Sequence, residues 1–156
     1  MISLKRKFNI ACLQTSPKPD FQSALEEAIV LAEESIEAGA DFIALPEYCG
    51  GLKTEVSAFA PPFATEENHP VLKGLRDFAK KRKKYLLIGS IAVTGPAGKI
   101  LNRSYIVDEF GNIISRYDKI HLFDIKFSEK ESYCESTTVS GGQKAVICET
   151  PLGCFG

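Results

Sequence analysis

Apolar and polar residues along the first half of the chain alternate in blocks that predict strands and helices. Residues 8–15 and 41–45 are short apolar runs of the kind that form buried strands. Between them, Asp20 can cap a helix that ends at Gly39. The apolar positions of this helix recur at helical spacing and are Phe21, Leu25, Ala28, Ile29, Ala32 and Ile36. A strand, a helix and a second strand predict two parallel strands covered by the helix.

The second half begins with another helix and continues as a series of strands. Pro70 suits the first turn of a helix whose apolar inner face is formed by Val71, Leu72, Leu75, Phe78 and Ala79. Turn residues separate three further predicted strands, at 85–92, 100–107 and 112–117. Residues 144–149 and 152–156 predict two more strands around Thr150-Pro151. The fold class is therefore α/β, with parallel strands and helices followed by antiparallel meanders.

Two long segments show no clear periodicity. Residues 49–68 form a predicted loop rich in Gly, Ala and Pro, and residues 121–142 form a second irregular segment. Loops of this length in a compact domain usually carry function. The segment 121–142 is therefore a candidate for part of a functional site.

Length and charge set limits on the class of protein. The 156 residues suit a single domain, and 44% hydrophobic with 25% charged residues is ordinary for a globular protein. The net charge of −1 gives no reason to expect nucleic acid or an anionic membrane as a partner. The basic run 80–84 fits a solvated helix end. Without an apolar stretch of spanning length or a recognisable signal peptide, the expected location is cytoplasmic.

The cysteines do not predict a disulfide framework or a metal site. Five cysteines stand at positions 12, 49, 134, 148 and 154, without a C-x-x-C pair, and the chain has only two histidines. We therefore expect reduced cysteines, with no metal and no cofactor. Cys12, Cys148 and Cys154 are expected to be buried and inert.

Two charged residues stand where predicted strands open into loops. Glu47 follows the apolar run 41–45, and Lys119 follows the strand predicted at 112–117. Either residue taken alone would more often be a solvated surface group. A carboxylate and an ammonium group brought together in a partly buried pocket can act as base and charge stabiliser in acyl transfer. We predict that their side chains lie side by side at the same end of the sheet.

The segments around these residues resemble the nitrilase, or carbon-nitrogen hydrolase, superfamily. The resemblance rests on Leu45-Pro46-Glu47 followed by Tyr117-Asp118-Lys119-Ile120-His121-Leu122-Phe123-Asp124. It extends through Glu131-Ser132-Tyr133-Cys134-Glu135-Ser136 and Gly141-Gly142 to Thr150-Pro151-Leu152-Gly153. Within the superfamily, these motifs are most similar to the branch that holds ω-amidase and deaminated glutathione amidase. The resemblance implies that residues 1–156 are the N-terminal part of a single carbon-nitrogen hydrolase domain.

The resemblance implies a Glu-Lys-Cys triad acting through a thioester intermediate. Glu47 would be the general base, with a pKa raised by burial, and Lys119 would stabilise the oxyanion. Glu135 would support Lys119 and help to place the substrate, while His121 and Asp124 would hold the lysine loop. In relatives, the nucleophilic cysteine lies in a Cys-Tyr-Asp turn after the strand that Thr150-Pro151 begins. This sequence stops at Gly156 before such a turn, so the 156-residue chain is expected to be inactive.

The same resemblance implies a fold, a substrate class and an assembly. The fold is an α-β-β-α sandwich, which would be incomplete at the C-terminus of this chain. The substrates are small linear ω-amides of dicarboxylic acids, or deaminated glutathione. The full-length protein would form a homodimer or a higher homo-oligomer through its helices.

Two other functions are compatible with parts of the sequence. The first is a non-catalytic, truncated pseudoenzyme or interaction module on the same scaffold. The second is another cysteine-dependent amidohydrolase, of the nicotinamidase type, which uses Asp, Lys and Cys and binds a metal. The absence of metal-ligand spacing argues against this second alternative.

Overall fold

The computed structural model describes residues 7–55, 58–126, 128 and 132–156. Its helices are α1 (Phe21–Glu37) and α2 (Pro70–Arg82), with three short 3-10 helices at Glu66–Asn68, Pro96–Gly98 and Glu135–Thr137. Its strands are β1 (Ile10–Cys12), β2 (Phe42–Ala44), β3 (Lys53–Glu55), β4 (Ala58–Ala60), β5 (Tyr85–Thr94), β6 (Ile100–Val107), β7 (Ile113–Asp118), β8 (Asp124–Lys126), β9 (Ser132–Cys134), β10 (Cys148–Thr150) and β11 (Gly153–Phe155).

Five of these strands form the central sheet, in the order β1-β2-β5-β6-β7. The first three are mutually parallel, and β5, β6 and β7 pair antiparallel. The predicted parallel pair β1–β2, connected through α1, is therefore confirmed. The register between β5 and β6 shifts between Ile88 and Ile91, which places an irregularity at Gly89-Ser90. Such a bulge bends a strand locally, and it lies beside the turn that carries Glu47.

Both helices begin at side-chain caps. Asp20 has extended backbone angles, and its Oδ1 accepts a hydrogen bond from Ser23 N at 2.9 Å, as the sequence predicts. His69 caps α2, because its Nδ1 accepts a hydrogen bond from Leu72 N at 3.4 Å, and Pro70 follows at the first helical position. The His69 ring is buried and meets Phe21 edge to face, with 4.7 Å between ring centroids.

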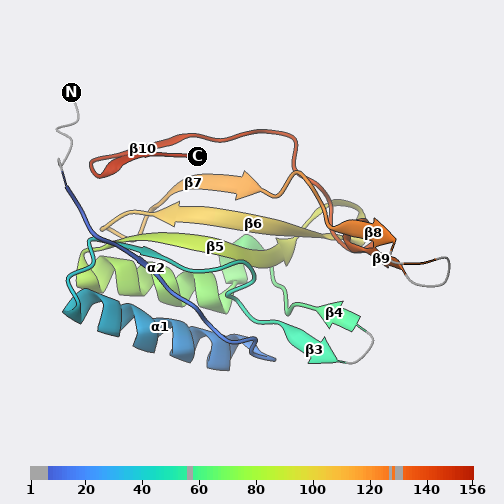
Figure 1. Cartoon of the computed structure of the whole chain (residues 1–156), viewed down its shortest axis with the longest axis horizontal. Helices are drawn as coiled ribbons and strands as arrows, with labels where there is room; N and C mark the ends of the chain where they lie inside the picture. The colour runs from blue at the N-terminus through green and yellow to red at the C-terminus, as the bar shows by residue number, and fades with distance from the viewer. Residues whose placement is uncertain (1–6, 56–57, 127, 129–131) are drawn as a thin grey trace.

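The main core lies between the helices and one face of the sheet. Figure 1 shows α1 and α2 together on one side of the strands. The sheet contributes fully or nearly fully buried aliphatic and aromatic side chains, namely Ile43, Leu45, Leu86, Ile88, Tyr105 and Val107. The helices contribute Ala28, Ala32, Val71, Leu72, Leu75, Phe78 and Ala79. This layer is the helix-on-sheet half of an α/β sandwich.

The opposite face of the sheet is covered only in part. The C-terminal segment, red in Figure 1, runs along this side of the strands. Between it and the sheet lies a cavity of about 580 Å³, lined by residues that include Leu87, Ile106, Tyr117, Val146 and Phe155. Stacking of Phe155 on Phe42, with 4.6 Å between ring centroids, attaches the last strand to this face. The described residues therefore place a helical layer on one face of the five-stranded sheet and the β10–β11 hairpin on the other face.

Several predicted details were wrong. The strands predicted at 8–15, 41–45 and 144–149 are shortened to β1, β2 and β10. The two segments without periodicity contain short antiparallel pairs, β3–β4 and β8–β9. Cys148 is buried as expected, but Cys12 and Cys154 are exposed. Cys12 lies on an outer strand of the sheet and Cys154 on the terminal hairpin, so neither is enclosed by a second layer.

Candidate active site

The turn that carries Glu47 is fixed by the bulge of β5. Ser90 Oγ accepts a hydrogen bond from Tyr48 N at 2.9 Å, and Ser90 O accepts one from Cys49 N at 3.0 Å. Ser90 N in turn donates to Pro46 O at 3.2 Å. Tyr48 adopts a left-handed conformation with φ of 52°, which is unusual for a bulky side chain. The chain therefore turns sharply after Glu47, and its direction is set by contacts with a neighbouring strand.

Lys119 is held at the end of β7 by the sheet itself. Its N–H donates to Asn102 O at 3.0 Å, which continues the ladder between β6 and β7. Its carbonyl accepts a hydrogen bond from Gly142 N at 2.8 Å. A Cβ at Gly142 would collide with the backbone of Asp118, so this close approach requires glycine. The backbone of Lys119 is thus fixed on both sides.

Glu47 and Lys119 lie side by side, as predicted. Lys119 Nζ is 2.8 Å from Glu47 Oε1, and Asn102 Nδ2 donates to the same oxygen at 2.7 Å. The side chain of Lys119 is 28% exposed, whereas that of Glu47 is 53% exposed. The expected burial of Glu47 is therefore wrong for the described chain, because its carboxylate lies at an open edge beyond the end of β2.

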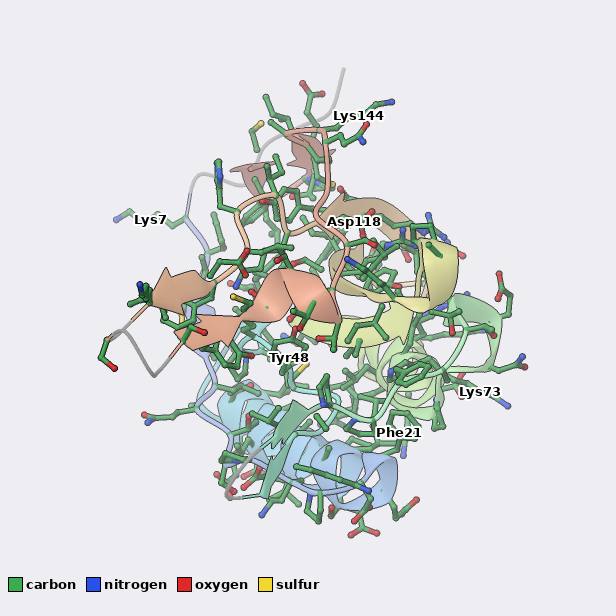
Figure 2. The ribbon with its side chains drawn as sticks, turned by 90° about the vertical axis from the view of Figure 1, so that its right-hand side faces the viewer. Lys7, Phe21, Tyr48, Lys73, Asp118 and Lys144 are labelled. Carbon is green, nitrogen blue, oxygen red and sulfur yellow. The ribbon has the colours of Figure 1, made fainter. Side chains whose placement is uncertain are left out.

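Glu135 joins the same cluster from the 3-10 helix at Glu135–Thr137. It is 4% exposed, and its Oε2 lies 3.6 Å from Lys119 Nζ and accepts a hydrogen bond from Phe123 N at 2.7 Å. Its Oε1 accepts a hydrogen bond from Tyr48 OH at 3.1 Å. Figure 2 views this end of the molecule, with Tyr48 below the short helix and Asp118 above it. Glu135 is therefore a buried carboxylate that contacts both the turn after Glu47 and the lysine.

The two carboxylates affect the charge of Lys119. Burial lowers the pKa of Lys119, but the hydrogen bond and charge of Glu47, followed by Glu135, more than offset this effect. The net result is a pKa above the usual value for lysine. Lys119 is therefore an ammonium ion at neutral pH.

A second set of charges supports the strand ends beside the site. Arg103 forms a bidentate pair with Asp118, with Nε–Oδ1 at 2.6 Å and Nη2–Oδ2 at 3.0 Å. Arg103 Nη1 and Arg116 Nη2 both contact Glu66, at 2.9 and 2.8 Å. Because Arg103 follows Asn102 and Asp118 precedes Lys119, this network connects the two strands next to the functional side chains.

The lysine motif also contains residues that hold the loop. Asp124 Oδ1 accepts a hydrogen bond from Ser136 N at 2.9 Å, which fits the structural role expected for Asp124. His121 is exposed.

Cys49 does not face the cluster as a reactive thiol. Its Sγ donates to Ser90 O at 3.3 Å, and burial raises its pKa to about 12. Within the described part of the chain, no hydrogen bond or ion pair joins a cysteine to Glu47, Lys119 or Glu135.

Residues 9–156 match the family model for carbon-nitrogen hydrolases. The chain belongs to the carbon-nitrogen hydrolase family. The match includes every residue of the cluster described above and nearly the whole length of the chain. The resemblance inferred from the motifs around Glu47 and Lys119 is therefore confirmed.

Among curated relatives, a deaminated glutathione amidase of Synechocystis is 33% identical over 138 residues, which are 86% of this chain and 49% of the relative. Omega-amidase NIT3 of Saccharomyces cerevisiae is 30% identical, over 98% of this chain and 55% of the relative. The chain thus spans about half the length of the curated relatives it matches. The crystal structure of S. cerevisiae Nit3, a member of branch 10 of the nitrilase superfamily, aligns with a TM-score of 0.78 at 28% identity, over 98% of this chain and 55% of that one.

The described residues of this carbon-nitrogen hydrolase chain were also compared with the requirements of a metal site and of a membrane-spanning helix. No group of three or more His, Cys, Asp or Glu side chains in them is arranged to hold a metal ion. None of the helices found there is long and apolar enough to cross a membrane.

Proposed function

We propose that this chain provides the base and the oxyanion stabiliser of an amidase that hydrolyses small linear amides through a thioester. The observation that carries the proposal is the 2.8 Å contact between Glu47 and Lys119, with Glu135 at 3.6 Å from the same ammonium group. Membership of the carbon-nitrogen hydrolase family supports the reaction class. The names of the relatives support ω-amides of dicarboxylic acids, or deaminated glutathione, as substrates.

The three side chains take different roles in the proposed reaction. Glu47 accepts the proton of a cysteine thiol and later activates the water that cleaves the thioester. Lys119 faces the oxyanion of each tetrahedral intermediate, where a compact positive charge is most effective. Glu135, buried between Tyr48 OH and Phe123 N, keeps the lysine near this position.

The nucleophile is a thiol that none of the described contacts brings to Glu47. Cys49 is excluded by its burial and by its hydrogen bond to Ser90 O. We therefore expect a polypeptide restricted to residues 1–156 to release no ammonia from amides, because Glu47 and Lys119 cannot form an acyl-enzyme alone. Robust cysteine-dependent activity of that polypeptide would contradict this expectation.

The test is ammonia release by the protein expressed from its natural reading frame, with monoamides of short dicarboxylic acids as substrates. Glu47→Gln and Lys119→Met should each lower kcat/KM by at least about 100-fold. The matched controls Glu67→Gln and Lys73→Met change exposed residues and should keep wild-type activity. Glu135→Gln should reduce turnover more than it reduces stability.

A natural protein that folds but hydrolyses none of these amides would refute the substrate class. If it also failed on other linear amides, the alternative of a non-catalytic module on the same scaffold would be favoured. If the site variants and their controls change kcat/KM equally, Glu47 and Lys119 take no part in the reaction.

A further inference from the structure

Asn102 connects the two charged groups of the site, although no sequence motif singles it out. It lies on β6, is only 2% exposed, and pairs in register with Ala92 of β5. Its side-chain amide donates to Glu47 Oε1, while its backbone carbonyl accepts the N–H of Lys119. One buried residue therefore contacts the carboxylate of Glu47 and the backbone of Lys119.

The hydrogen bonds on Glu47 are unequal between its two oxygens. Oε1 accepts from Asn102 Nδ2 at 2.7 Å and from Lys119 Nζ at 2.8 Å. Among the described residues, Oε2 accepts no hydrogen bond, and the side chain is 53% exposed. Two donors on one oxygen fix the carboxylate plane and leave the lone pairs of the other oxygen available.

We propose that Asn102 is a positioning residue: its hydrogen bond holds Oε1 of Glu47, so that Oε2 is the oxygen that accepts the proton. The assignment of proton transfer rests on the proposed amidase function, whereas the hydrogen bond itself does not. A general base requires a free lone pair in a fixed direction. Lys119 alone cannot fix that direction, because a flexible ammonium group is a point charge without a planar donor geometry.

Asparagine suits this position because its amide donates without titrating. An aspartate here would place a second carboxylate against Glu47, and two close carboxylates raise the pKa of one of them. A leucine, which branches at Cγ as asparagine does but has no donor, would leave Oε1 with Lys119 as its only described partner. The backbone hydrogen bond from Lys119 N to Asn102 O remains in either variant, so the comparison isolates the side chain.

The first experiment follows the Glu47 carboxyl carbon and the Asn102 side-chain amide by NMR during a pH titration of the natural protein. In the wild type, the Asn102 amide resonances should shift with the same midpoint as the Glu47 carboxyl. This measurement needs no substitution at position 102. Asn102 resonances that do not respond to the Glu47 titration would overturn the proposal.

Asn102→Leu should shift the carboxyl carbon resonance of Glu47 at pH 7.5 relative to the wild type, because the hydrogen bond from the amide to Oε1 is removed. Asn102→Asp, which also removes the amide donor, should shift this resonance too. The matched control is Asn112→Leu, since the Asn112 amide donates to Asp108 Oδ2 at 3.1 Å, a similar amide-to-carboxylate contact outside the Glu47 cluster. This control should leave the Glu47 carboxyl resonance unchanged, and an equal shift of that resonance in both leucine variants would overturn the assignment.

Activity then separates this inference from the proposed function. Asn102→Leu should lower kcat by about 10- to 100-fold with little change in KM, as expected for a misdirected base. If Glu47→Gln abolishes turnover while Asn102→Leu changes neither kcat nor the acidic limb of the pH profile, the positioning role fails and the proposed function stands. If the Glu47 resonance shifts as expected in the Asn102 variants but no amide is hydrolysed, the hydrogen-bonded arrangement stands and the proposed function fails.

Discussion

His69 should make the folded chain sensitive to mild acid. Burial lowers the pKa of His69 from 6.5 to about 4, although the carbonyl of Ala92 partly opposes this effect. At pH 7.5 the imidazole is neutral in both the folded and the unfolded chain, so it contributes no pH dependence. As the pH falls below 6.5, the unfolded chain binds a proton that the folded chain binds only near pH 4, and stability decreases.

The size of this effect follows from the two pKa values. One pKa unit corresponds to about 1.36 kcal/mol, and integration between 6.5 and 4 gives a loss of about 2 kcal/mol at pH 5 relative to pH 7.5. The loss would approach about 3 kcal/mol at pH 4. These losses are large compared with the total free energy of unfolding of a small domain, which is roughly 5–15 kcal/mol.

The assay is urea denaturation at pH 7.5 and pH 5.0, followed by circular dichroism, for the wild type and His69→Asn. Asparagine is also a good helix cap, so the variant retains a partner for Leu72 N while removing the titrating ring. Its lost packing against Phe21 should lower stability equally at both pH values. Carboxylates with lowered pKa values, such as Glu66, affect both proteins and cancel in the comparison. The reasoning is refuted if the two proteins lose the same stability between pH 7.5 and 5.0.

Two further substitutions test the contacts around the site. Tyr48→Phe should lower the free energy of unfolding by about 2 kcal/mol, because the buried Glu135 loses a hydrogen-bond donor. Reversible urea denaturation at pH 7.5 measures this change, and an unchanged midpoint would contradict the prediction. Arg103→Met should cost about 2–3 kcal/mol by leaving Asp118 without its bidentate partner, whereas Arg82→Met, at an exposed ion pair, should cost under about 1 kcal/mol. Equal melting temperatures for these two arginine variants would show that the Asp118 pair contributes no more than a surface contact.

The sequence was most informative where one residue decides a local structure. Asp20 and Pro70 fixed the starts of the two helices, and the periodicity of their apolar residues identified the faces that enter the core. Glu47 and Lys119 were found because each follows a predicted strand within a motif that resembles the carbon-nitrogen hydrolases. Parallel and antiparallel pairing then brought the ends of β2 and β7 to one end of the sheet.

The remaining features depend on contacts between distant strands, which local periodicity does not encode. Asn102 occupies an ordinary strand position, and only the pairing of β6 with its neighbours places its amide against Glu47. The left-handed turn at Tyr48 depends on a hydrogen bond to Ser90, and after this turn the Cys49 thiol donates to Ser90 O. A signal for this turn did exist in Gly89, since a Cβ there would collide with the backbone oxygens of Leu45 and Pro46.

The separation of the site residues along the chain links the site to folding. Glu47 and Lys119 are 72 positions apart, and Tyr48 and Glu135 are 87 positions apart. In the sheet, β5 and β6 stand between the strands that lead to Glu47 and to Lys119, so no smaller group of strands can assemble the pair. Closing such long loops is entropically unfavourable until the intervening strands are ordered. A ligand that bridges Glu47 and Lys119 would therefore bind only the fully assembled sheet, and its binding free energy would protect the whole chain against thermal unfolding and proteolysis.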